Sequence, residues 1–326
     1  MQAAFYVRQG GAEVLSVGDQ PRPEPGHGEV RVRLRTSGVN PSDWKSRKGG
    51  AGRAMRAPLV IPHSDGAGDI DAVGEGAPAD RIGQRVWIWN GQWQRAFGTA
   101  AEHICVPSRQ AVVLPEPLGY AEGACLGIPA CTAMQAVRLG LVGPGMRVLI
   151  AGGAGAVGHY AIQMAKARGA VVLTTVSSDA KAAHARSAGA DHVINYRSDD
   201  VAARVNQATA GVGVDLVIEM DLSTNAALYP QILRPHAKVV VYGLSSSEAT
   251  LPILWLMQNS ITLQFFLIYE IDIADRQSVL EELDALLREG KLRHTVGRRL
   301  PLAQVAQAHD LVEQGVVMGN VVLDIS

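Results

Sequence analysis

Three glycines near the middle of the chain have the spacing of a turn that binds a dinucleotide. A short apolar run over 148–151 leads into this turn, and an amphipathic helical pattern follows over 157–166. In G-x-G-x-x-G the first glycine allows a tight turn, the second lets the backbone approach a pyrophosphate, and the third lets helix and strand pack closely. The helix N-terminus offers unpaired N–H groups to the phosphates. The residues predicted to bind the dinucleotide are Gly153, Ala154, Gly155, Ala156, Val157 and Gly158. A glycine-rich turn that binds nothing is the alternative.

The end of the next predicted strand, 170–176, bears on which dinucleotide is bound. A site for NAD places an Asp or Glu about 20 residues past the glycines, where it binds the ribose hydroxyls. This chain has Ser177 and Ser178 there, with Lys181 one turn further on. Hydroxyls and an ammonium suit a 2′-phosphate, whereas Asp179 is expected to open the following helix. The pattern favours NADPH over NADH, although Lys181 alone is better explained as a solvated helix residue.

Composition restricts the class of protein. The chain has 326 residues, enough for two domains with a core each, and its apolar and charged fractions are those of a globular enzyme. A net charge of −1 gives no electrostatic reason to bind nucleic acid or an anionic membrane. No apolar run approaches the roughly 18 residues of a membrane span, and no signal peptide is visible. With three cysteines and no C-x-x-C pair, we expect a cytoplasmic protein.

The hydrophobic pattern changes near residue 122. Before that point, short alternating segments are broken by Pro and Gly clusters, which is typical of a β-rich unit. After it, strands alternate with helical stretches, which predicts a parallel, doubly wound α/β sheet. The strands are expected at 148–151, 171–176, 192–194, 216–218 and 238–242, followed by helices at 276–289 and 302–314 and a last strand at 320–325. That last strand is expected to return to the first domain.

Several segments, in order along the whole chain, resemble the medium-chain dehydrogenase/reductase superfamily. Each is weak alone, but their order and spacing together resemble its zinc-free quinone oxidoreductase (zeta-crystallin-like) branch. Besides the glycine turn, the matching segments are 38–43, 64–68, 73–74, 83–86, 99–102, 188–191 and 319–323.

The resemblance implies a fold, a cofactor and an assembly. It implies a GroES-like catalytic domain over 1–122 and 263–326, with a Rossmann NADP(H)-binding domain over 123–262 and the cofactor in a cleft. It also implies a homodimer or homotetramer, formed where the edge strand of the Rossmann sheet pairs across subunits. The apolar run 261–268 is the expected edge strand.

The same resemblance bears on metals. Zinc-dependent relatives carry a ligand Cys where this chain has Asn40, a ligand His where it has Ser64, and a third ligand near 127–128. Zinc is bound by thiolate, imidazole or carboxylate groups, which these residues lack. His63 is one position away and is expected to be a loop or core residue. The cysteines of the structural zinc lobe are also missing, so no metal site is expected.

Without a Lewis acid, oxidation of an alcohol is disfavoured. Acceptors that need little activation, such as quinones or C=C bonds conjugated to a carbonyl, are favoured instead. The cofactor supplies the hydride, so the protein orients the reactants and excludes water.

Four residues are candidates for the acceptor side of the site. The amide of Asn40 can donate to a ligand carbonyl, or Asn40 can be only a turn residue before Pro41. Ser42 matches a proton-relay hydroxyl of zinc-dependent relatives, or it caps the helix that follows. Quinone reductases carry a tyrosine where this chain has Trp44 and Lys45, which can supply an apolar wall and a cation. A second expected tyrosine falls around 49–52.

The resemblance also places residues beside the cofactor. Each has a plain structural alternative, such as a packing residue, a strand end or an exposed loop residue. They are Asn40, Thr132, Tyr196, Gly243, Ser245, Leu267, Ile268, Tyr269 and Asn320. Tyr269 and Thr132 also count among the catalytic candidates. Next to them, Glu219-Met220-Asp221 replaces the more usual Asp-x-x-Gly turn.

Three functions remain open. The first is an NADPH-dependent quinone oxidoreductase acting on a small-molecule substrate. The second is an enoyl or alkenal (enone) reductase of the same fold, which needs a proton donor such as Ser42 or Tyr269. The third is a non-enzymatic cofactor-binding protein. No basic or aromatic tract favours nucleic acid.

Overall fold

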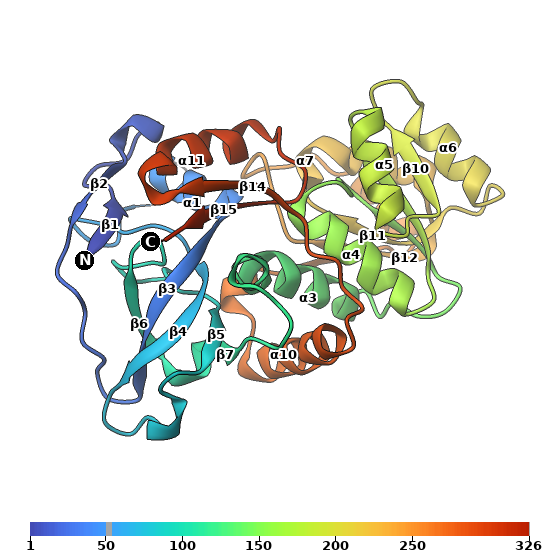
Figure 1. Ribbon diagram of the computed structural model, residues 1–326. Helices are drawn as coiled ribbons and strands as arrows, with labels where there is room; N and C mark the ends of the chain where they lie inside the picture. The colour runs from blue at the N-terminus through green and yellow to red at the C-terminus, as the bar shows by residue number, and fades with distance from the viewer. Residues whose placement is uncertain (50–53, 326) are drawn as a thin grey trace. The chain divides into compact units, whose positions relative to one another are not determined.

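The computed structural model describes residues 1–49 and 54–325. They fold as two compact units (Figure 1): unit 1 is Met1–Pro129 with His294–Ser326, and unit 2 is Ala130–Arg293. Both ends of the chain belong to unit 1. The boundaries expected from the sequence, after 122 and after 262, differ from those observed, after 129 and after 293.

Unit 1 is built on a seven-stranded, mostly antiparallel sheet. The strand order is β14-β15-β3-β4-β5-β7, and β6 pairs with β3 beside this path. The strands are β3 (Glu29–Val39), β4 (Asp65–Val73), β5 (Arg85–Ile88), β6 (His103–Pro107), β7 (Ala111–Val113), β14 (Val296–Pro301) and β15 (Asn320–Asp324), and β1 (Gln2–Phe5) and β2 (Ser16–Asp19) form a separate pair. The terminal strand β15 pairs with β3, as the sequence analysis predicted.

Short helices complete unit 1. The α-helices are α1 (Pro41–Lys48), α2 (Tyr120–Gly123) and α11 (Val305–Gln314), and the 3₁₀ turns are η1 (Ala12–Val14), η2 (Ala79–Arg81), η3 (Ser108–Gln110) and η7 (Leu302–Gln304). A π turn, η4, runs over Leu126–Ala130. The core lies between the sheet and α11, because Val32 and Leu34 of β3 pack in one cluster with Val305 and Ala308 of the helix.

Unit 2 is a six-stranded parallel sheet with helices along its length. Its strand order is β10-β9-β8-β11-β12-β13, the 3-2-1-4-5-6 order of a Rossmann fold. The strands are β8 (Arg147–Ile150), β9 (Val171–Val176), β10 (His192–Asn195), β11 (Val214–Glu219), β12 (Leu233–Val241) and β13 (Thr262–Phe265). The helices are α3 (Cys131–Leu139), α4 (Ala156–Ala167), α5 (Asp179–Ser187), α6 (Val201–Ala208), α7 (Leu222–Asn225), α8 (Tyr229–Ile232), α9 (Ile253–Gln258) and α10 (Ile273–Arg288), with 3₁₀ turns η5 (Ala226–Leu228) and η6 (Ile268–Glu270).

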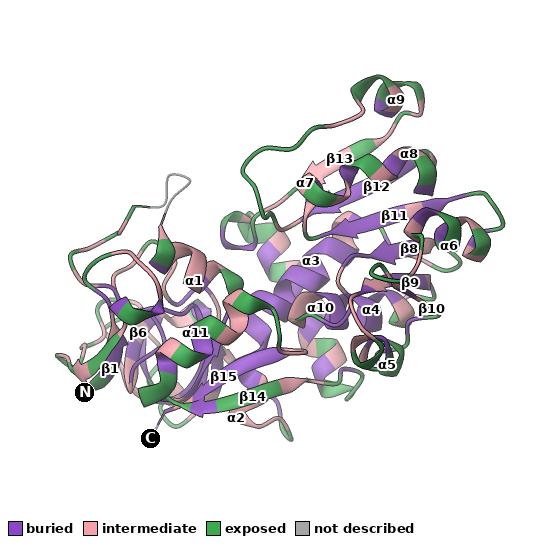
Figure 2. Cartoon of the chain, turned by 90° about the horizontal axis from the view of Figure 1, so that it is seen from above, coloured by how far each residue is buried: buried purple, intermediate pink, exposed green. Residues whose placement is uncertain are grey.

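The doubly wound sheet predicted from the sequence is confirmed. The central strands β8, β9, β11 and β12 are largely buried (purple in Figure 2), which is why they read as continuous apolar runs. Chain order reverses between β8 and β11, and ligands of such sheets bind outside the carboxyl ends of the strands at this switch point.

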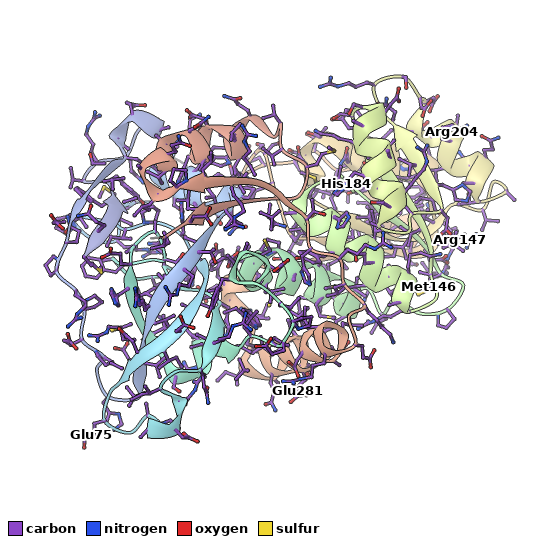
Figure 3. The ribbon with its side chains drawn as sticks, in the orientation of Figure 1. Glu75, Met146, Arg147, His184, Arg204 and Glu281 are labelled. Atoms are coloured by element: carbon purple, nitrogen blue, oxygen red, sulfur yellow. The ribbon has the colours of Figure 1, made fainter. Side chains whose placement is uncertain are left out.

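The amino ends of the central strands are tied together by one carboxylate. Arg147 of β8 (labelled in Figure 3) donates from Nε to Asp215 of β11 at 2.9 Å, and Arg234 of β12 binds the same carboxylate. Burial opposes ionisation of Asp215, but the hydrogen bonds from both arginines outweigh it and lower its pKa to about 2.

Residues 263–293 fold with unit 2 because two of their elements complete it. β13 pairs in parallel with β12 as the sixth strand, and α10 packs against α3. The side chain of Gln135 on α3 donates to Asp275 on α10 at 2.7 Å. The helix predicted at 276–289 begins earlier, at Ile273, because Asp272 caps it by accepting the N–H of Asp275. Within the described part of the chain, no helix is both long and apolar enough to cross a membrane.

A buried hydrogen-bonded chain crosses unit 1 and ends in two stacked histidines. Thr99 donates its hydroxyl to the carbonyl of Asp65 at 2.5 Å, so the 2.8 Å bond between Ser37 and Thr99 uses the proton of Ser37. His63 must then donate from Nδ1 to Ser37 at 2.9 Å. The other nitrogen of His63 accepts from Nε2 of His309 at 2.9 Å. His63 is thus a buried core residue, as expected.

Both histidines are held neutral. Burial lowers the pKa of His63 to about 3, and burial, His63 and Arg47 lower the pKa of His309 well below 6.5. In the unfolded chain both histidines become protonated near pH 6.5, whereas in the folded chain they stay neutral. The folded state is therefore destabilised relative to the unfolded state as the pH falls below about 6.5. Burial raises the pKa of Asp43 to about 7, which opposes the effect by one proton.

We therefore expect the stability of unit 1 to fall with pH below about 6.5, and His309→Leu to flatten that fall. With only one of the two histidines left, the slope of the free energy of unfolding against pH should be smaller by about 1.4 kcal/mol per pH unit. Urea unfolding between pH 5 and pH 7, followed by tryptophan fluorescence, measures it, because four of the five tryptophans lie in unit 1. His27→Leu, at an exposed histidine, is the control. An unchanged slope in His309→Leu would show that His309 is protonated in the folded protein.

Candidate functional site

The turn between β8 and α4 packs so closely against β9 and the first turn of α4 that most of its glycines leave no space for a side chain. Gly152 adopts a positive φ of 70°, a conformation that favours glycine. The sequence analysis assigned the tight turn to Gly153, but φ is positive one residue earlier. Gly153 is required for another reason: a Cβ there would lie 2.1 Å from Oγ1 of Thr174 on β9.

The other two glycines differ in the space around them. A Cβ on Gly158 would lie 2.4 Å from the carbonyl oxygen of Gly152, so Gly158 allows helix and turn to pack, as predicted. A Cβ on Gly155 would meet only that same carbonyl, at 3.4 Å. Gly155 is also the N-cap residue of α4, and no side chain caps the helix. The free N–H groups of the first turn and the open face of Gly155 therefore fit a pyrophosphate.

The carboxyl ends of β9 and β10 bring together the residues predicted to bind a 2′-phosphate. Asn195 of β10 pairs with Val176 of β9, so Tyr196 and Ser177, which follow directly, lie side by side. Tyr196 is 53% exposed. Ser178 is occupied as the N-cap of α5, where its hydroxyl accepts the N–H of Lys181 at 3.3 Å.

Lys181 therefore lies one turn into α5, and the helix begins at Asp179, as predicted. Arg197, which the sequence analysis did not select, is also exposed beside Tyr196. The sequence shows that Arg197 follows a strand end, but an arginine there does not by itself indicate a phosphate site, because exposed arginines are common.

The end of β11 carries two carboxylates with different roles. Glu219 is buried and accepts from Asn225 and Tyr229, at 2.9 and 3.0 Å; burial raises its pKa. Asp221 accepts from the hydroxyl of Ser245 at 2.8 Å. Ser245, a predicted cofactor residue, is thus fixed by the Glu219-Met220-Asp221 turn that departs from the family pattern.

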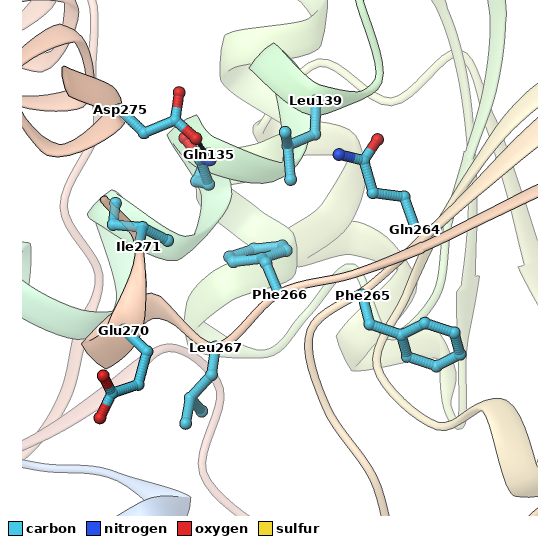
Figure 4. A pocket seen from close by; sticks show the side chains of 9 residues that line it. All are labelled: Gln135, Leu139, Gln264, Phe265, Phe266, Leu267, Glu270, Ile271 and Asp275. Carbon is cyan, nitrogen blue, oxygen red and sulfur yellow. Dashed lines mark hydrogen bonds between the residues drawn. The ribbon is translucent and has the colours of Figure 1, made fainter. Parts of the chain in front are cut away.

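A pocket of about 330 Å³ lies at the end of β13, between α3 and α10 (Figure 4). Its residues are Gln135, Leu139, Gln264, Phe265, Phe266, Leu267, Glu270, Ile271 and Asp275. Leu267, predicted to lie beside the cofactor, is half exposed, whereas Ile268 and Tyr269 are buried in η6. The carbonyl oxygen of the Gln135 side chain is buried and has no hydrogen-bond partner within the described residues.

In unit 1, the predicted acceptor-side residues lie at the start of α1. Asn40 is the N-cap residue of this helix, which begins at Pro41, and only 4% of Asn40 is exposed. Its Nδ2 donates to Oδ2 of Asp65 at 2.8 Å. Its backbone N–H donates to the carboxylate of Asp43 at 2.7 Å, so Asp43 stabilises the helix start.

Further along α1, Ser42, Trp44 and Lys45 are half-buried. The ammonium groups of Lys45 and Lys48 each lie 5.6 Å from the centre of the Trp44 ring, within the range of a cation–π interaction. The aromatic wall and cation predicted at this position are therefore adjacent. The second tyrosine position, around 49–52, lies mostly outside the described residues.

Three predicted cofactor residues are held in place by contacts within the fold. Thr132 is the second residue of α3 and is buried among core residues of unit 2. Asn320, at the start of β15, donates from its backbone and from Nδ2 to the carbonyl of Thr295, at 2.8 and 3.0 Å. Gly243 passes close to the carbonyl of Met220, which a Cβ would meet at 2.5 Å. A role for them in binding remains a prediction.

The residues at the zinc positions do not fit a zinc ion. Asn40 and Ser64 offer no suitable donor, and a Cβ on Gly127 would lie 2.3 Å from Oδ1 of Asp65. The carboxylate of Asp65 therefore fills the space into which a side chain at 127 would project. Among residues 1–49 and 54–325, no three His, Cys, Asp or Glu side chains are grouped to hold a metal ion.

Asp65 is the functional candidate that the sequence analysis missed. It lies within the matched segment 64–68, where a carboxylate begins the largely buried strand β4. Its partner Asn40 is 25 residues earlier, so only the pairing of β3 with β4 reveals the contact.

The chain resembles known proteins over its whole length. An alcohol dehydrogenase GroES-like domain matches residues 26–116, and a zinc-binding dehydrogenase domain matches residues 156–286. Human quinone oxidoreductase is 30% identical over 317 residues, which cover 97% of this chain and 94% of the human protein.

Solved structures agree with the sequence matches. An NAD-dependent alcohol dehydrogenase is 30% identical, with a TM-score of 0.91, and the alignment covers 100% of both chains. Escherichia coli quinone oxidoreductase in complex with NADPH is 25% identical, with a TM-score of 0.90 and the same coverage.

The GroES-like sheet of unit 1 and the Rossmann sheet of unit 2 define an oxidoreductase of the medium-chain dehydrogenase/reductase superfamily. Within that superfamily, the chain belongs to the quinone oxidoreductase family. The resemblance noted in the sequence is thus confirmed.

The two glycines of the turn give a matched pair of variants. Gly155→Ala should weaken NADPH binding by about tenfold or more, because a methyl group would stand between the backbone and the pyrophosphate. Its melting temperature should change little, since the added Cβ has space. Gly158→Ala should instead lower stability by about 1–3 kcal/mol. NADPH fluorescence titration and thermal melts measure both effects. Unchanged NADPH affinity in Gly155→Ala would remove this turn from the cofactor site.

Proposed function

We propose that the protein is an NADPH-dependent quinone oxidoreductase that works without zinc. The observation that carries the proposal is the site at the start of α1: the Asn40–Asp65 pair fills the place of a zinc site in a chain whose glycine turn keeps space for a pyrophosphate. A carbonyl that must be polarised by a Lewis acid is a poor substrate for such a site. A quinone accepts a hydride without that help.

We assign cofactor binding to unit 2. The first turn of α4 and the open face of Gly155 would hold the pyrophosphate. Ser177, Lys181 and Tyr196 would hold the 2′-phosphate, because the end of β9 carries hydroxyls and a nearby ammonium rather than a carboxylate. The structure of Escherichia coli quinone oxidoreductase, which is similar to this chain, was solved with NADPH, which supports NADPH as the cofactor here. When bound, the reduced nicotinamide supplies the hydride.

The acceptor side of the site is α1 and the residue that caps it. The amide of Asn40 would donate to the acceptor oxygen, where negative charge develops as the hydride arrives. Trp44 would provide an apolar wall, and Lys45, close to the Trp44 ring, a cation. Ser42 would supply a proton to the reduced acceptor.

We propose that the chain forms a homodimer through the edge strand of unit 2. β13 is the last strand of the sheet, and its Phe265 is 61% exposed. On the preceding helix α9 (labelled in Figure 2), Ile253, Leu254 and Met257 are also exposed. An unpaired edge beside exposed apolar side chains is a site for strand pairing with a second copy. We also propose a cytoplasmic location, where the three free cysteines would stay reduced.

The test of the proposed reaction is NADPH oxidation by the purified, chelator-treated protein. We expect turnover with 1,4-benzoquinone and 9,10-phenanthrenequinone, unchanged by the chelator, because no step depends on a metal. A 2-alkenal and a primary alcohol with NADP⁺ are the comparison substrates, and NADH replaces NADPH in a parallel series. NADH should be the weaker donor.

Other outcomes would redirect the assignment. Turnover of the alkenal alone would make the protein a double-bond reductase. Loss of all activity on chelation would contradict the zinc-free reading, and silence with every acceptor would leave a cofactor-binding protein. Equal use of NADH would contradict the role given to Ser177 and Lys181.

The proposed dimer is tested by Phe265→Asp. A charge at the edge should prevent strand pairing, so light scattering after gel filtration should give one chain mass, 34.5 kDa, instead of twice that value. Ile82→Asp, at an exposed apolar residue of unit 1, should leave the dimer intact. A wild-type protein that elutes as a single chain would contradict the proposal.

A further inference from the structure

We propose that Asp65 is a positioning residue for the reaction: it fixes the side-chain amide of Asn40 so that the amide donates a hydrogen bond to the acceptor. This inference rests on the proposed function, because it concerns the acceptor side of that site. Asp65 would act through Asn40 and not touch the reacting atoms itself.

The sheet of unit 1 places the two side chains together. Asp65 is the first residue of β4 and pairs with Gly38 of β3 in an antiparallel ladder. Asn40 follows two residues after Gly38, at the point where β3 ends and α1 begins. The distance from Nδ2 of Asn40 to Oδ2 of Asp65 is 2.8 Å, that of a well-formed hydrogen bond.

The carboxylate is enclosed rather than attached to a surface. Asp65 is fully buried, and a Cβ on Gly127 would lie 2.3 Å from its Oδ1 and 2.5 Å from the carbonyl of Ile88. Only glycine at position 127 leaves room for this carboxylate. The backbone of Asp65 is held as well, because its carbonyl accepts the hydroxyl of Thr99. The position of the carboxylate is therefore set from two sides, by the strand and by the turn η4.

The chemistry of the pair determines which way the amide faces. An ionised carboxylate only accepts hydrogen bonds, whereas an Asn side chain has a donor end and an acceptor end that are nearly equal in shape. Asp65 selects the rotamer in which Nδ2 faces it. The second N–H of the same nitrogen then keeps a fixed direction, and a bond to a carboxylate polarises the amide. Without Asp65, the amide can turn and present its oxygen, which would repel the negative charge developing on the acceptor.

The decisive experiment exchanges the two side chains. In the double variant Asn40→Asp with Asp65→Asn, the hydrogen bond can form again with the donor on β4, so packing and stability should return. Position 40 then carries an acceptor, so kcat with a quinone should stay about tenfold or more below wild type. A purely structural pair would regain activity together with stability.

Single variants and a matched control complete the series. Asp65→Asn alone should lower kcat about tenfold with NADPH affinity within twofold of wild type, because the residues proposed to hold the pyrophosphate and the 2′-phosphate lie in unit 2. Asn40→Asp alone should lower the melting temperature, since two carboxylates would then face each other. Asp71→Asn, at another carboxylate of β4 that pairs with Arg31 at the edge of the strand, should leave kcat unchanged. The position of the Asn40 amide is read independently of activity, from its ¹H–¹⁵N side-chain resonance and hydrogen exchange.

The outcomes separate the role of Asp65 from the proposed quinone reduction. Wild-type kcat in Asp65→Asn, or activity restored in the exchanged pair, would overturn the role of Asp65 while leaving quinone reduction intact. A wild-type protein that reduces no quinone would overturn the proposed function. In that case, hydrogen exchange of the Asn40 side-chain amide still tests Asp65. Slow exchange in wild type that becomes fast in Asp65→Asn would show that Asp65 fixes the amide. Fast exchange in wild type would overturn that role.

Discussion

The proposed dinucleotide site depends on how closely the backbone of the β8–α4 turn can pack. Gly152 has a positive φ, Gly153 lies against Thr174 of β9, and Gly158 lies against the carbonyl of Gly152. A Cβ at position 153 or 158 would force the turn, α4 and β9 apart, whereas position 152 favours glycine for its positive φ. Because the helix starts this close to the carboxyl edge, its first turn and the open face of Gly155 end at the switch point of the sheet. The ends of β9 and β10 then bring Ser177 and Tyr196 to the same edge.

A second constraint lies in unit 1 and concerns a buried polar side chain rather than the packing of glycine backbone. There the close packing is around a polar group, the carboxylate of Asp65, which is fully buried against Gly127 and Asn40. Burying a carboxylate costs free energy that a well-packed apolar residue would not. A group retained at such a cost, at the start of the helix that carries the acceptor-side residues, is better explained by chemistry than by stability.

The elements with a regular pattern could be predicted from the sequence. Buried parallel strands read as apolar runs, so all five strands expected in unit 2 are present, and the terminal strand returns to β3 as predicted. Strand ends were less visible: β12 begins at Leu233 and not at 238, because Arg234 and His236 interrupt its apolar pattern. The predicted domain boundary after 262 separates β13 from the sheet in which it pairs with β12, although the apolar run 261–268 was itself expected to be the edge strand of that sheet.

The site was predictable where a motif is local and not where the contact depends on register. The glycine spacing is contained in six residues, so the turn was found, but the motif does not reveal which glycine has the positive φ. Asp65 meets Asn40 only because β4 pairs with β3 in one register, and a shift by one residue would point Asp65 to the other face of the sheet. The replacement of zinc ligands by Asn40 and Ser64 could be read directly from the chain. What stands in their place could not, because it required knowing that Gly127 leaves space for the carboxylate of Asp65.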